Sequence, residues 1–136
     1  SMAWPLAHLE DKVIVCAMDA RRKQVYNALF SAQEGALIRI REDRAISLDE
    51  LAEDIQGLEK PVFLVGDGSR LTYQTLKDRI PQLVMPPEHR MHQRAAGVAI
   101  VAEKMLERGE ACDAAALQPN YLRLSQAERE RLEREK

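Results

Sequence analysis

Residues 13–30, VIVCAMDARRKQVYNALF, decide the fold because they contain two strands and the turn between them. The first six residues are apolar at every position, which is typical of a strand buried on both faces at the centre of a sheet. The second strand alternates instead, with Val25 and Leu29 on one face and Tyr26 on the other. The stretch therefore predicts a hairpin with residues 19–22 at its tip.

The hairpin tip carries charged residues where a tight turn usually carries Gly, Asn or Pro. One interpretation is a solvated surface turn. The other is a contact with a partner, an anion or RNA, for which Asp19, Arg21 and Arg22 are the candidate residues, since guanidinium groups offer paired donors that suit phosphate and carboxylate. In that interpretation Asp19 orients one of the arginines through an ion pair. The residues alone leave both interpretations open.

The pattern changes period after a third strand at residues 36–41. Ser47-Leu48-Asp49-Glu50 has the sequence of a capping box, and apolar residues then follow at helical spacing up to Leu58. The elements expected beyond this helix are a buried strand (61–65), a helix (71–80), a short strand (82–87) and a longer amphipathic helix (95–109).

This order of elements predicts an α/β fold of the ribonuclease-H-like type. Its mixed five-stranded sheet has three antiparallel strands first and helices on the faces. Residues 1–124 are assigned to this domain. Residues 125–136 are assigned to a charged C-terminal helical tail, which opens with a second capping box from Ser125 to Glu128.

Composition excludes several classes of partner and compartment. With 20 basic and 22 acidic side chains the net charge is −2, so no global field attracts nucleic acid or an anionic membrane, and an RNA contact would need a local patch. No apolar run reaches the length of a membrane span. Cys16 and Cys112 do not resemble a disulfide framework, so the cytoplasm is the expected compartment.

Motifs that carry chemistry are weak in this chain. The loop Gly66, Asp67, Gly68 follows a buried strand and is a candidate phosphate-proximal loop, although a tight strand-to-helix turn is the more common meaning of such a sequence. His89 and His92 have the spacing of some metal ligands but lie beside Pro86-Pro87 without a Cys or acidic cluster, so no metal site is predicted. No serine lies in a nucleophile elbow, and no catalytic residue is predicted.

Three blocks of sequence resemble one family of proteins. MDARRKQVYNALF (18–30), VGDGS (65–69) and DAAALQPNYLR (113–123) are similar, in order and spacing, to the bacterial TsaB (YeaZ) family, whose members are often labelled glycoproteases. The resemblance covers nearly the whole chain and implies one half of a tandem of two ribonuclease-H-like halves, the actin and hexokinase (ASKHA) architecture. It matches only the C-terminal half of the family's pattern. We therefore expect a fragment, made by design or by proteolysis.

The resemblance also implies a function. Family members act in installing the threonylcarbamoyl group of N6-threonylcarbamoyladenosine in transfer RNA. The chain is then expected to be a noncatalytic scaffold and activator subunit, paired through the full-length protein with a TsaD (Gcp-like) subunit and a TsaE-like ATPase, and with tRNA indirectly. No cofactor is expected on this chain, ATP being bound in the assembled complex.

Two other functions remain open, a glycoprotease-type peptidase or hydrolase and a nucleotide-binding, actin-like ATPase domain. The hydrolase interpretation lacks a nucleophile and base pair, and the ATPase interpretation lacks its first phosphate loop. A homodimer is also expected, with no membrane contact. Its main contributor would be an exposed apolar segment at residues 2–9, MAWPLAHL.

Overall fold

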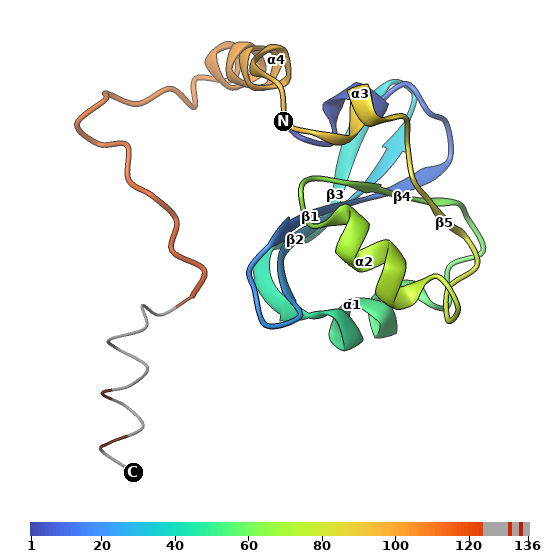
Figure 1. Cartoon of the computed structure of the whole chain (residues 1–136). Helices are drawn as coiled ribbons and strands as arrows, with labels where there is room; N and C mark the ends of the chain where they lie inside the picture. Colours follow the sequence, from blue (N-terminus) through green and yellow to red (C-terminus); the bar gives the residue numbers. More distant parts are fainter. Residues whose placement is uncertain (124–130, 132–133, 135–136) are drawn as a thin grey trace.

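The computed structural model of the chain describes residues 1–123, 131 and 134. Its centre is a five-stranded sheet in the order β3-β2-β1-β4-β5 (Figure 1). The strands are β1 (Lys12–Asp19), β2 (Gln24–Gln33), β3 (Ala36–Ser47), β4 (Val62–Val65) and β5 (Leu83–Val84). The first three pair antiparallel, whereas β4 runs parallel to β1 and β5 parallel to β4. The predicted mixed sheet with three antiparallel strands first is confirmed.

Strand β1 lies in the middle of the sheet, as its continuous apolar sequence predicts. Val13 and Val15 enter the main core on one face, and Ile14 enters a smaller apolar cluster on the other. Ile14 and Val15 are completely buried. Full burial of an aliphatic side chain of this size stabilises the fold by about 1.5–3 kcal/mol, so β1 organises both layers.

Helices α1 (Leu48–Ile55) and α2 (Ser69–Leu76) complete the main core on one side of the sheet (Figure 1). The capping box at the start of α1 is present in full. The Ser47 hydroxyl accepts from the Glu50 backbone N–H over 3.2 Å, and the Glu50 carboxylate accepts from the Ser47 N–H over 2.7 Å. The helical stripe that follows buries Leu51 and Ile55 completely.

A carboxylate on α1 ties the helix to the two strands of the outer hairpin. Asp54 accepts from Arg41 over 3.3 Å and also from Arg44, both on β3. Arg44 in turn donates to the side-chain oxygen of the buried Asn27 on β2. A bulge between Asn27 and Leu29 shifts the register of β2 and β3 next to these arginines. Strand β3 extends beyond the predicted 36–41, because its pairing with β2 continues to Ser47.

The opposite face of the sheet is covered in part by the N-terminal residues. A 3-10 turn, η1 (Trp4–Leu6), places Ala3 and Leu6 against Ile14 in the smaller cluster, and both are buried. The expectation of an exposed apolar segment at residues 2–9 is wrong for Leu6, which is buried, whereas Trp4 and Leu9 are half-buried. Ala3 and Leu6 cover part of the side of the sheet that α1 and α2 leave uncovered. The homodimer itself stays a prediction.

Helix α4 (Ala95–Glu107) forms where its periodicity predicts, but its apolar face is not packed against the sheet. Val98 is 45% exposed and Leu106 is 67% exposed, and α4 projects away from the sheet in Figure 1. Periodicity indicates a stripe on a helix and does not indicate what covers it. A short helix, α3 (Glu88–Met91), begins directly after Pro86-Pro87 and contains His89.

The predicted C-terminal tail, including the capping box from Ser125 to Glu128, lies outside the described residues apart from Arg131 and Arg134. Among the helices of the described part, none is both long and apolar enough to cross a membrane.

Candidate interaction site at the hairpin tip

The turn between β1 and β2 has an unusual backbone. Arg21, Arg22 and Lys23 have φ angles of 62°, 54° and 58°, so three consecutive residues with side chains lie in the left-handed region. Each costs about 1–2 kcal/mol relative to a right-handed conformation. Such a run persists only where the surrounding structure fixes it. The tip is therefore held in a strained conformation although no glycine is present.

Hydrogen bonds within the turn fix part of this conformation. The Asp19 carboxylate accepts from the Arg21 backbone N–H over 2.7 Å. The Ala20 N–H donates to the Gln24 carbonyl over 3.0 Å, and the Gln24 N–H donates to the Arg21 carbonyl over 3.0 Å. The expected ion pair between Asp19 and an arginine is absent among the described residues. The Asp19 carboxylate instead accepts from the Arg21 amide, which lies in the turn and is not hydrogen-bonded to the neighbouring strand.

The cationic side chains of the tip point to solvent. Arg21, Arg22 and Lys23 are exposed, and within residues 1–123 none of them forms an ion pair. By contrast, Arg41 and Arg44 are both paired with Asp54. The tip therefore presents three exposed cations beside the carboxylates of Asp19 and Asp67, which accept from backbone amides. A local group of cations of this kind is what a protein of nearly neutral net charge would need for an anionic partner.

The Gly66-Asp67-Gly68 loop packs against the end of β1, beside the tip. Gly66 has a φ of 106°, and a Cβ there would lie 2.2 Å from the Ala17 carbonyl oxygen. The Gly68 N–H donates to that oxygen over 3.0 Å, and the Gly66 N–H donates to the Met91 carbonyl over 2.7 Å. Both glycine amides are thus used inside the fold, which favours a tight turn. A phosphate beside this loop stays a prediction.

Residues at the end of the described chain also reach the tip. Arg123 Nη1 donates to the Ala20 carbonyl oxygen over 3.0 Å, across 103 positions of sequence. The Asp67 carboxylate accepts from the neighbouring Asp19 backbone N–H over 3.2 Å. All three sequence blocks that carry the family resemblance therefore meet at the tip.

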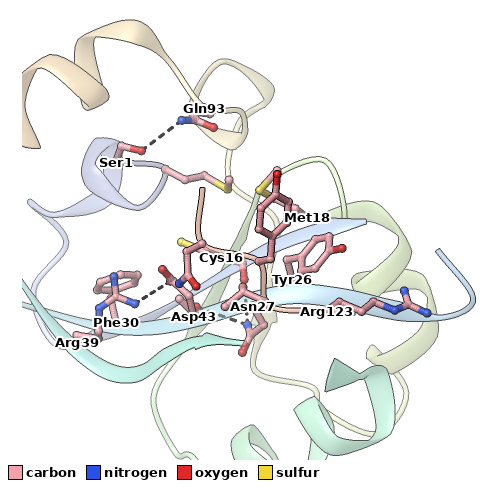
Figure 2. Close-up of a pocket in the computed structure, with 15 residues that line it drawn as sticks. Ser1, Cys16, Met18, Tyr26, Asn27, Phe30, Arg39, Asp43, Gln93 and Arg123 are labelled. Atoms are coloured by element: carbon pink, nitrogen blue, oxygen red, sulfur yellow. Dashed lines mark hydrogen bonds and ion pairs between the residues drawn. The ribbon is translucent and has the colours of Figure 1, made fainter. Parts of the chain in front are cut away.

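A cavity of about 450 Å³ lies beside this contact, between the face of β1 and β2 and residues 120–123 (Figure 2). Its apolar lining includes Cys16, Met18 and Tyr26, and its polar lining includes Arg39, Asp43, Gln93 and Asn120. Burial raises the pKa of the Cys16 thiol to about 12. That thiol is therefore protonated at neutral pH and is a poor nucleophile.

Contacts typical of a catalytic or metal site are absent from the described part of the chain. No group of three or more His, Cys, Asp and Glu side chains could hold a metal ion there. The Ser69 hydroxyl donates to the Gly66 carbonyl, and the His8 ring lies 2.9 Å from Arg90 Nη1. Neither contact pairs a hydroxyl or thiol with a base.

Sequence reasoning missed the contact that Arg123 makes at this site and the left-handed backbone at Lys23. Lys23 shares the left-handed conformation of the two arginines, for which its sequence carries no signal because non-glycine residues rarely adopt it. Arg123 stands in the third resemblance block, so the signal was present. Its contact with Ala20 joins segments that no local pattern relates.

The sheet order and the helices define a ribonuclease-H-like α/β domain. The chain is 29% identical over 127 residues to the tRNA threonylcarbamoyladenosine biosynthesis protein TsaB of Bacillus subtilis (strain 168), covering 93% of this chain and 54% of that protein. A crystal structure of a Pseudomonas aeruginosa protein with similarity to peptidase YeaZ matches the fold with a TM-score of 0.64 and 22% identity, covering 90% of this chain and 55% of that one. The resemblance to the TsaB (YeaZ) family is thereby confirmed.

The chain spans about half the length of both relatives. No protein-family model matches it.

Proposed function

We propose that this chain is part of a noncatalytic accessory subunit in the formation of threonylcarbamoyladenosine in tRNA. The proposed contact surface for the rest of the machinery is the hairpin tip, residues 19–23. The convergence of the three resemblance blocks at the tip carries the proposal, because residues far apart in sequence support one exposed, charged and strained turn. Similarity to the Bacillus subtilis biosynthesis protein supplies the process.

The proposed partners are a TsaD (Gcp-like) subunit and a TsaE-like ATPase in the cytoplasm, engaged through the full-length protein, with tRNA contacted indirectly. Surface guanidinium groups without ion-pair partners suit either a carboxylate surface of a protein or a phosphate. ATP belongs to the assembled complex in this proposal. Both glycine amides of the one candidate phosphate loop already donate to carbonyl groups of the fold.

A peptidase is the second candidate, because the similar Pseudomonas aeruginosa protein is described by its similarity to a peptidase. The contacts of the described residues do not favour it. Cys16 has a raised pKa, and neither Ser69 nor His8 contacts a catalytic partner. Hydrolysis of a fluorogenic peptide library by the purified chain, lost on substitution of a single Ser, Cys or His, would replace the accessory role with this one.

The proposal is tested by purification from the source cell with a tagged full-length protein as bait. Recovery of a Gcp-like subunit with the unchanged bait, and its loss with Arg21→Ala and Arg22→Ala together, supports the tip as the contact surface. The matched control is Arg70→Ala with Arg79→Ala, since both arginines are exposed and form surface ion pairs. Equal recovery with all three baits contradicts the proposed surface.

A further inference from the structure

Arg123 anchors a long exposed segment to the sheet. Residues 109–121 after α4 are all exposed. The backbone hydrogen bonds from Ala116 to Asp113 and from Leu117 to Ala114 are local to this segment. Of the described residues from 109 to 123, Arg123 alone donates a side-chain hydrogen bond to the sheet domain. The position of residues 120–123 over the cavity therefore depends on this arginine.

The acceptor of this bond is a carbonyl group that needs a donor. Ala20 is 6% exposed. It lies outside β1 and β2, so its carbonyl oxygen is not hydrogen-bonded in the pairing of these strands. No second donor to that oxygen occurs among the described residues. Buried carbonyl groups are nearly always paired, and the Arg123 guanidinium makes a charge-assisted bond here.

The same carbonyl belongs to the peptide group that leads into the strained turn. Ala20 stands between Asp19, whose N–H is held by the Asp67 carboxylate, and Arg21, the first of the three left-handed residues. Fixing the orientation of this peptide group restricts the backbone at the start of the turn. Asp67 thus holds the peptide group between Met18 and Asp19. Arg123 holds the carbonyl end of the peptide group between Ala20 and Arg21, whose N–H donates to the Asp19 carboxylate.

We propose that Arg123 is a positioning residue, which holds the tip arginines in their left-handed conformation through the Ala20 carbonyl. The coupling is reciprocal, so a partner that engages the tip in this conformation also stabilises residues 120–123 on the face of β1 and β2. The relevance to tRNA modification rests on the proposed function. The positioning itself is a property of this chain and is measured without RNA or partner.

Amide hydrogen exchange of the whole chain, followed by NMR, tests the proposal. In Arg123→Ala, exchange at the Ala20 and Gln24 amides should become about tenfold faster or more, because the turn loses a charge-assisted bond. Exchange at Val15 in the central strand should not change. Arg123→Lys keeps a donor on a long side chain and should recover most of the protection. The matched control is Arg108→Ala, whose side chain pairs with Glu110 in the same segment.

Unchanged exchange at Ala20 and Gln24 in Arg123→Ala overturns the proposal. An equal effect of Arg108→Ala overturns it too, as does an increase shared by Val15, because these would reflect a general loss of packing. Failure of the proposed function has a different signature. In that case tRNA modification stays normal with altered tip arginines, whatever the exchange rates are.

Discussion

The backbone N–H of Asp19 donates to the Asp67 carboxylate over 3.2 Å, joining the end of β1 to the loop after β4 across 48 positions of sequence. The two strands are parallel neighbours, so their carboxyl ends lie side by side. The loop approaches β1 so closely that there is no room for a side chain at Gly66. The support of the tip thus depends on a glycine in another segment.

Gly66→Ala should destabilise the domain by at least about 2 kcal/mol, since it combines a positive φ with a clash against backbone. A Cβ at Gly66 would lie 2.2 Å from the Ala17 oxygen, whereas at Gly57 it would meet nothing within 4 Å. Gly57→Ala is therefore the control, expected within about 0.5 kcal/mol of the unchanged protein. Urea unfolding of both variants measures the difference, and equal midpoints would contradict the packing described.

Asp54→Ala should cost about 1–3 kcal/mol, because it leaves Arg41 and Arg44 without their common partner. Asp49→Ala is the matched control on the same helix. It removes an exposed ion pair with Arg79 and should cost under about 1 kcal/mol. Thermal unfolding at pH 7 compares the two variants. An equal loss of stability would mean that the Asp54 contacts contribute no more than an exposed ion pair.

Acid should weaken the same interaction. Burial raises the pKa of Asp54, but hydrogen bonds and charge from Arg44 and Arg41 outweigh it and hold the pKa below its ordinary value. The folded state therefore binds this proton less readily than the unfolded state. The stabilisation is complete above the unfolded pKa of about 3.9 and is lost as the pH falls through the folded value. Asp54→Asn should flatten this part of the stability profile, and an unaltered profile would rule the effect out.

The two cysteines should differ in reactivity. Burial raises the pKa of Cys16 to about 12, whereas Cys112 is exposed. Because the thiolate is the reacting form, iodoacetamide at pH 8 should label Cys112 quickly and Cys16 slowly. Peptide mass spectrometry over time gives both rates. Comparable rates in the folded protein would show that the face of β1 beside the cavity opens readily.

The sequence predicted the elements whose formation depends on residues close together in the chain. The apolar run of β1 and the capping box at Ser47 and Glu50 each specify an element without help from distant residues. The full length of β3 was not predicted because residues 42–45 are mostly charged and show no strand pattern of their own. They extend the strand because β2 lies alongside and pairs with it as far as Ser47. Burial of Leu6 was missed because it depends on which face of the sheet the helices leave uncovered.

The charged residues of the hairpin tip stand out in the sequence, whereas the geometry of the tip does not. The charged tip at Asp19, Arg21 and Arg22 stands out in the sequence because it lacks turn-forming residues. Its left-handed backbone, and the contact of Arg123 with Ala20, depend on segments brought together by the fold. The expected ion pair of Asp19 is not found in the described part of the chain, where the Asp19 carboxylate accepts from the Arg21 backbone N–H instead.

In the proposed function the side chains of Arg21 and Arg22 at the tip bind a partner and do not stabilise the fold. Arg21→Ala and Arg22→Ala together should change stability by no more than about 0.5 kcal/mol, because both side chains are exposed and make no ion pair in the described part of the chain. The affinity of the full-length protein for its proposed partner should fall roughly ten- to a hundredfold, because a charge-assisted contact worth about 1.5–3 kcal/mol is lost.

The most direct measurement is the threonylcarbamoyladenosine content of tRNA in a deletion strain complemented with the full-length protein carrying both substitutions. We expect a clear fall in modified tRNA at normal protein level and normal melting temperature, with no fall for Arg70→Ala and Arg79→Ala. Normal modification in the tip variant, at the same protein level, would show that the tip is only a solvated turn.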